Sequence, residues 1–258
     1  MRYEFLKFFK GKKLYGMIVF AYAIPILLFA LPELLDAEYP DSANDFVASQ
    51  MGFMVIVIVI SASFFGSSSI VSEFHDRTAY SLLPNPVNRE SIWFGKFFAA
   101  LAISFMISSI FYKVIVIGTW IEYENIPSEI IFSWGLSFAV VVMVTSISFL
   151  FSSILKGPTG ATVAVFILFI LIFPMVEGII IAFDESKPWW LPSFMAKITG
   201  FSMFTPYPSD LEPGELPRGP FDSQRFVAYI DQSILMMAVY ILATSAASIF
   251  IFKKKEMS

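Results

Sequence analysis

The chain has 258 residues, of which 57% are hydrophobic and 15% are charged, and its formal net charge is −4. A soluble domain of this length is not so apolar. The chain has no Cys, which excludes disulfides and thiolate sites, and its single His, His75, makes a histidine metal cluster or a Ser/His/Asp triad very hard to assemble.

Six long hydrophobic stretches account for most of the chain. Each is long enough to cross roughly 30 Å of hydrocarbon at about 1.5 Å per helical residue. The stretches are Leu14–Leu31, Met51–Ile70, Phe97–Thr119, Ile130–Leu155, Gly160–Phe183 and Gln232–Phe252. Their only charged residues are Lys113 and Glu177. We therefore predict an all-α membrane protein with six transmembrane helices, organised as one domain over residues 1–258.

The connections between the stretches sort by charge. One side carries 12 of the 17 basic residues: Arg2, Lys7, Lys10, Lys12, Lys13, Arg77, Arg89, Lys96, Lys156, Lys253, Lys254 and Lys255. The other side carries acidic clusters around residues 33–45 and 122–129 and an acidic last loop. Because basic residues concentrate on the cytoplasmic side of a membrane, we predict a multi-pass protein of the cell membrane with both termini in the cytoplasm.

Residues 1–13 precede the first stretch and have two dissimilar faces. Phe5, Leu6, Phe8 and Phe9 fall on one helical face, opposite a charged face. This pattern is typical of an amphipathic helix in the cytoplasmic interface, with its basic side towards anionic lipid. The alternative is a disordered basic tail that only sets topology. The first stretch is longer than the apolar core of a signal peptide, about 7–15 residues, and we expect it to be retained.

The cytoplasmic connection over residues 72–96 has the most distinctive sequence. A charged cluster leaves the second stretch, a Leu-Leu pair follows, and Pro84-Asn85-Pro86 then breaks the chain. Arg89 and Lys96 flank the start of the third stretch. This order predicts a short amphipathic helix, a rigid turn and a second amphipathic segment, which together are suited to pressing on a soluble partner.

This connection resembles that of the membrane subunits of ABC-2 type exporters. In that family an acidic residue ends a span and is followed by Gly-Thr, Leu-Leu, Pro-Val-x-Arg and Gly-Lys. The matching residues here are Glu73, Thr78, Leu82-Leu83, Pro86-Val87-Asn88-Arg89 and Gly95-Lys96. Arg77 stands where the family usually has Gly, a departure that concerns the local backbone freedom before Thr78. The resemblance extends to the whole chain, which shares with the family six spans, cytoplasmic termini, an amphipathic N-terminal helix and a long last outer loop.

The resemblance implies a permease that dimerises, with itself or with a related permease, and binds two separate ATPase subunits. It implies that the residues that dock against these subunits include Glu73, Arg77, Thr78, Leu82, Leu83 and Arg89. The sequence has no G-x-x-x-x-G-K-[ST] motif, and in residues 156–160 the Lys precedes the glycines with no strand before it. We therefore expect a transport subunit that is not an enzyme and binds no cofactor, with ATP hydrolysed by the partner.

Two charged and two small polar residues are candidates for a pathway or gate. Glu177, near the outer end of the fifth stretch, marks a functional site or lies at the interface where the span breaks. Lys113 extends to the interface or pairs with Glu177. Ser63 and Ser67 belong to the densest set of small polar residues, and such sets pack helices together or line a polar pathway.

The outer loop over residues 184–226 is rich in Pro, Trp and acidic residues. Trp189 and Trp190 suit a belt at the level of the lipid headgroups. Residues 191–204 predict a short helix that dips into the outer leaflet or lies on it. The loop is the longest soluble segment, and its roughly forty residues are too few for an enzyme domain.

Three other functions stay open on the sequence alone. An ion-coupled secondary transporter needs charged or unwound sites near the midplane and often an internal repeat, whereas deep charges are scarce here. A membrane enzyme needs clustered His, Asp, Cys or Ser-Lys groups at membrane depth. A non-transporting scaffold or sensor with the same fold is the third. The sequence has no basic surface interleaved with aromatic residues, which is the pattern that nucleic-acid binding requires. The pathway candidates are apolar and bear hydroxyl groups, which favours amphipathic or lipid-like cargo.

Overall fold

The computed structural model describes residues 8–9, 11–75, 89–184, 186–210 and 226–254. Within these ranges the chain forms helices and no strand. By length and composition, the helical stretches that can cross a membrane are Lys12–Leu34, Ala43–Ser72, Arg89–Tyr123, Glu129–Ile154, Pro158–Phe183 and Ile230–Lys254. The predicted all-α fold with six transmembrane helices is confirmed.

Two of the spans are interrupted by π-helical turns and the other four are single helices. The single helices are α2 (Lys12–Leu34), α6 (Arg89–Tyr123), α7 (Glu129–Ile154) and α12 (Ile230–Lys254). Span 2 consists of α3 (Ala43–Ala62), the π-helical η1 (Ser63–Ser67) and α4 (Ser68–His75). Span 5 consists of α8 (Pro158–Phe166), η2 (Ile167–Ile172), α9 (Phe173–Ile179) and η3 (Ile180–Asp184). Two short helices, α10 (Pro192–Ala196) and α11 (Ile198–Phe201), precede α12.

Some helices extend beyond the hydrophobic stretches that predict them. Span 2 begins at Ala43, because the Ser42 hydroxyl caps the helix by accepting a hydrogen bond from the Asp45 N–H at 3.1 Å. Hydropathy finds only the apolar part of a helix, and capped polar turns lie outside it. Of the predicted interfacial helix over residues 1–13, residues 1–7 and 10 lie outside the described residues, while Phe8 and Phe9 are helical.

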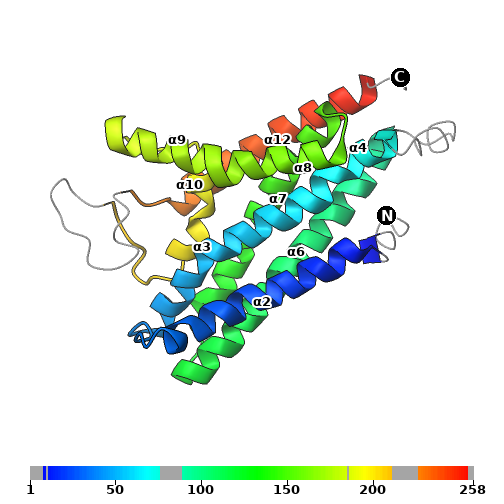
Figure 1. Ribbon diagram of the computed structural model, residues 1–258. Helices are drawn as coiled ribbons and strands as arrows, with labels where there is room; N and C mark the ends of the chain where they lie inside the picture. Colours follow the sequence, from blue (N-terminus) through cyan, green and yellow to red (C-terminus); the bar gives the residue numbers. More distant parts are fainter. Residues whose placement is uncertain (1–7, 10, 76–88, 185, 211–225, 255–258) are drawn as a thin grey trace.

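Span 2, α6 and α7 form the core of the bundle. At least half of the apolar window of each is buried, whereas less than a quarter of the window is buried in α2, span 5 and α12. The α2 helix packs against α6, and α12 packs along α7 (Figure 1). Exposed apolar faces suit contact with lipid, because lipid tails are as apolar as the side chains they touch.

The chain segments nearest to the two termini lie at the same end of the bundle. Figure 1 places the start of α2, the end of α4 and the end of α12 there. The described basic residues at this end include Lys12, Lys13, Arg89, Lys156, Lys253 and Lys254. We call it the basic end, and the other end, which holds α10 and α11, the opposite end.

At the π-helical turn η1, span 2 lies in close contact with α7. A Cβ atom added to Gly66 would lie 2.8 Å from the Ser148 Cβ atom on α7, which is closer than real Cβ atoms approach their neighbours. Glycine is therefore required at this position by the contact between the helices. Small residues at such crossings let helices pack tightly in the absence of a hydrophobic driving force.

The π-helical turn also changes the hydrogen bonding of span 2, and α7 compensates for it. The N–H groups of Ile70 and Val71 both donate to the Ser152 hydroxyl oxygen on α7, each at 3.0 Å. An unsatisfied backbone group in the hydrocarbon region costs several kcal/mol, and a hydroxyl oxygen has two lone pairs that can accept both donors. Ser152 therefore stabilises the irregular segment of span 2 and fixes its position against α7.

The contact between Gly66 and Ser148 generates a testable prediction. Gly66→Ala should lower the free energy of unfolding by roughly 1–3 kcal/mol, because the added methyl group forces span 2 and α7 apart. The matched control is Gly135→Ala on α7, where an added Cβ meets no atom within 4 Å. Thermal unfolding of both variants in detergent measures the difference. Equal unfolding midpoints would contradict the close contact.

Candidate functional site

Residues 191–204 of the outer loop form α10 and α11, which confirms the predicted short helical segments. Their apolar side chains, such as Phe194, Met195 and Ile198, are buried against the transmembrane helices. The Ser133 hydroxyl of α7 donates to the Thr199 carbonyl oxygen at 2.7 Å. The Asn44 side-chain amide of α3 donates to the Met203 carbonyl oxygen at 2.5 Å. These bonds join the pair of short helices, which we call the α10–α11 hairpin, to α3 and α7.

A cavity of about 470 Å³ lies between α3, span 5 and the α10–α11 hairpin. Such a volume is typical of small-molecule sites, which range from about 300 to 1,000 Å³. Most of the wall is apolar. The lining residues are Met51, Gly52, Val55, Ile56, Val59, Phe169, Ile170, Pro174, Glu177, Gly178, Ile181, Ser193, Lys197, Thr199, Gly200 and Phe201.

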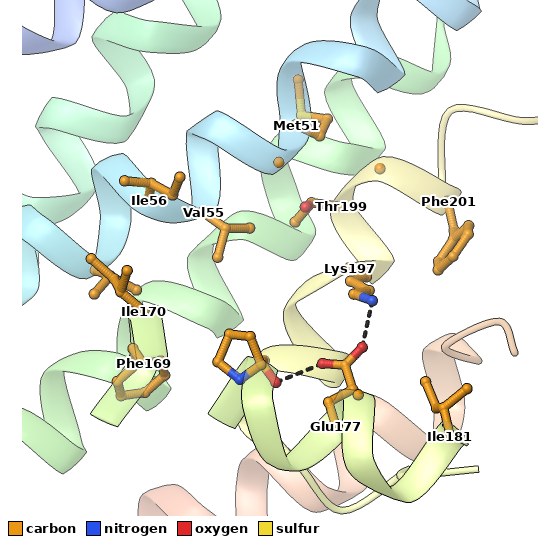
Figure 2. Close-up of a pocket in the computed structure, with 16 residues that line it drawn as sticks. Met51, Val55, Ile56, Phe169, Ile170, Glu177, Ile181, Lys197, Thr199 and Phe201 are labelled. Carbon is orange, nitrogen blue, oxygen red and sulfur yellow. Dashed lines mark hydrogen bonds and ion pairs between the residues drawn. The ribbon is translucent and has the colours of Figure 1, made fainter. Parts of the chain in front are cut away.

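The polar part of the cavity is an ion pair between span 5 and the hairpin. Figure 2 shows the Glu177 carboxylate of α9 directed at the Lys197 ammonium group, which bonds to it at 2.5 Å. The Ser193 hydroxyl donates to the second carboxylate oxygen at 2.7 Å. Glu177 is 5% exposed, and burial of a carboxylate is costly unless an opposite charge and hydrogen-bond donors accompany it. The hairpin supplies both.

The sequence singled out Glu177 but not its partners. The alternative pairing with Lys113 is wrong, because Lys113 is exposed on α6 and Glu177 pairs with Lys197. A signal for Lys197 was present, since it is the only charged residue in the apolar segment over residues 191–204. Ser193 carried no such signal, because a hydroxyl in a loop has many ordinary uses.

Ser63 and Ser67 do not line this cavity. Both are fully buried in η1, and the Ser67 hydroxyl lies 2.8 Å from the Thr162 hydroxyl of α8. Together with the contact at Gly66, this bond indicates a role in helix packing for Ser67. A pathway role for Ser63 and Ser67 stays a prediction.

The predicted coupling residues are only partly described. Arg77, Thr78, Leu82 and Leu83 lie outside the described residues, and Glu73 lies in α4. Arg89, the first residue of α6, donates to the Lys253 carbonyl oxygen at 2.8 Å and to the Phe252 carbonyl oxygen at 3.4 Å. A cation at the last carbonyls of a helix also meets the negative end of its dipole. Arg89 therefore joins the start of α6 to the end of α12.

The described residues contain no candidate metal site. No group of three or more His, Asp or Glu side chains among them is arranged to hold a metal ion. The chemistry available at the cavity is therefore an apolar surface with one carboxylate, one ammonium group and two hydroxyl groups, from Ser193 and Thr199. Such a surface can bind and orient a molecule that has both apolar and polar groups.

Six helices of membrane-crossing length and composition define a polytopic membrane protein. Residues 9–257 match the model of the family described as ABC-2 family transporter protein, and the chain belongs to this family. The resemblance found in the sequence is thereby confirmed. Membership makes the chain a membrane permease subunit of an ABC transporter and implies an ABC ATPase as its partner. The search among curated proteins found no match.

The ion pair in the cavity generates a second prediction. Lys197→Met should lower the free energy of unfolding by about 3 kcal/mol, because Glu177 then remains buried without an opposite charge. The double change Glu177→Gln/Lys197→Met should recover most of this loss, because no uncompensated charge is left. Both variants can be compared by thermal unfolding in detergent. A double variant no more stable than Lys197→Met would show that the charges do not interact.

Proposed function

We propose that the chain is the membrane half of an ABC-2 type exporter, that it works as a dimer, and that separate subunits hydrolyse ATP for it. We further propose that the cavity between α3, span 5 and the α10–α11 hairpin is part of the translocation pathway. The observation that carries this proposal is the position of a buried ion pair in the wall of a largely apolar cavity. A paired charge in such a place is expensive and is expected where function requires it.

The chemistry of the cavity suits an amphipathic cargo. Apolar side chains such as Val55, Ile56 and Phe169 cover most of the wall, and the ion pair offers one polar point of attachment. The same ion pair holds the hairpin against span 5. A cargo with a charged or strongly polar group competes for Glu177 or Lys197, and this competition would release the hairpin and open the cavity towards the opposite end.

Coupling to the ATPase passes through the connection between α4 and α6. The α4 helix is held to α7 through the bonds to Ser152, and α6 is held to α12 through Arg89. A force on the connection therefore acts on span 2, which forms one wall of the cavity. At its other end the connection leads into α6, so the same force acts on α6 and, through Arg89, on α12. The basic end faces the cytoplasm in this proposal, as the distribution of Lys and Arg requires.

The first test is co-purification of the tagged chain from its native membranes in mild detergent. We expect a stoichiometric ATPase subunit, and the double change Glu73→Ala/Arg89→Ala should reduce its retention or lower ATP hydrolysis by roughly ten-fold, the loss of a charge-assisted hydrogen bond. Lys156→Ala, at the same end but outside the connection, is the control. A chain that purifies alone and without ATPase activity would favour a secondary transporter or a scaffold.

The second test follows the cavity through the ATPase cycle. The chain has no Cys, so one introduced cysteine is its single thiol. The labelling of that thiol can be measured once the chain is separated from its partner subunits on a gel. Gly52→Cys and Gly178→Cys place a thiol on opposite walls of the cavity, and an added Cβ meets no atom within 4 Å at either position. We expect their maleimide labelling rates to change together between the nucleotide-free and the vanadate-trapped complex.

Matched controls make the labelling result decisive. Gly16→Cys and Gly135→Cys are equally free of neighbouring atoms and lie outside the cavity. Their labelling should be the same in both states of the complex. If all four positions respond alike, or if neither cavity position responds, the cavity is not part of the pathway.

A further inference from the structure

A second cavity, of about 410 Å³, lies at the basic end. Its walls come from the segment before and at the start of α2, from the last part of span 2 and from the first residue of α8. The lining residues are Phe8, Gly11, Lys12, Lys13, Phe64, Phe65, Ser68, Ser69, Ser72 and Pro158. None of them lines the cavity beside Glu177.

The chemistry of this cavity is divided into an aromatic part and a basic part. Phe8 meets Phe65 edge to face, with ring centroids 5.3 Å apart, which holds the segment before α2 against span 2. Phe64 extends the aromatic wall. Lys12 and Lys13 are exposed and form no ion pair with a described carboxylate. The cavity therefore has an apolar side and two ammonium groups without a counter-ion among the described residues.

The hydroxyl groups of the cavity differ in what they can donate. Ser68 and Ser69 donate to the carbonyl oxygens of Phe64 and Phe65 one turn earlier, so their hydroxyl hydrogens are in use. The Ser72 hydroxyl makes no hydrogen bond to a described residue and can donate to a ligand. Two ammonium groups and one free hydroxyl donor suit an oxyanion such as a phosphate.

We propose that this cavity binds an anionic phospholipid of the cytoplasmic leaflet, with its phosphate at Lys12, Lys13 and Ser72 and the start of its acyl chains against the phenylalanine rings. Charge complementarity selects this occupant. Residues 1–13 carry five basic residues and one acidic residue, and the cytoplasmic leaflet is the negatively charged surface to which such segments are drawn. A free phosphate matches the ammonium groups but leaves the aromatic wall without a partner.

The bound lipid lies next to the connection that is proposed to contact the ATPase. The cavity touches η1 and α4, and the connection proposed to contact the ATPase begins directly after Ser72. The lipid therefore joins the segment before α2 to the end of span 2 on the membrane side of that connection. This binding does not depend on the identity of the cargo or on the proposed pathway.

Native mass spectrometry of the full-length chain in detergent tests the proposal. Phosphatidylglycerol should bind more tightly than phosphatidylcholine, and Lys12→Gln/Lys13→Gln should weaken phosphatidylglycerol binding by roughly 30-fold. The control Lys156→Gln/Lys254→Gln removes the same charge from the same end outside the cavity and should change binding little. Both pairs of lysines are exposed, and unchanged thermal unfolding confirms that the variants are folded.

Three outcomes would overturn the proposal. Equal affinity of the unaltered chain for the two lipids would show that the net negative charge of the headgroup is not recognised. An equal loss in the two double variants would show general attraction to the basic end rather than binding in the cavity. Displacement of the lipid by excess glycerol 3-phosphate or inorganic phosphate would show a site for a free anion and not for a lipid.

Discussion

In the hydrocarbon region of a membrane every backbone polar group must find its partner within the protein, and the contact of span 2 with α7 meets this requirement where it is hardest to satisfy. Span 2 is irregular at η1, and two of its N–H groups bond to the Ser152 hydroxyl. Gly66 makes this possible, because only a residue without a side chain lets the helices come so close. The positions of both cavities follow, since span 2 forms a wall of each.

The same constraint explains the ion pair at the opposite end. Glu177 lies on span 5, which has few buried residues, yet its carboxylate is buried because the α10–α11 hairpin covers it. The hairpin in turn depends on hydrogen bonds to α3 and α7. The outer part of span 5, around α9, is thus joined to the core through an intermediary that belongs to a loop. An arrangement of this kind is less rigid than direct helix packing, because two contacts in series must both hold.

The sequence predicts the helices well because each span is a continuous apolar stretch, and it predicts Glu177 as a candidate because a charge in such a stretch is conspicuous. It does not predict the π-helical turns, since Ser63–Ser67 has the composition of an ordinary tightly packed helix. It does not predict Lys197 as the partner of Glu177, because the two residues meet only when the outer loop folds back into the bundle. Pairings of this kind depend on tertiary structure and leave no periodic pattern in the sequence.

Span 5 is attached by polar contacts near both of its ends. The Ser67–Thr162 bond holds it at the basic end, and the Glu177–Lys197 pair holds it towards the other. The two attachments are separated by fifteen residues, or roughly 22 Å of helix. A tilt of about 5° about Thr162 would therefore move Glu177 by roughly 2 Å, enough to break its bonds to the hairpin. The distance between the two attachments therefore converts a small rotation at Thr162 into a much larger displacement at Glu177.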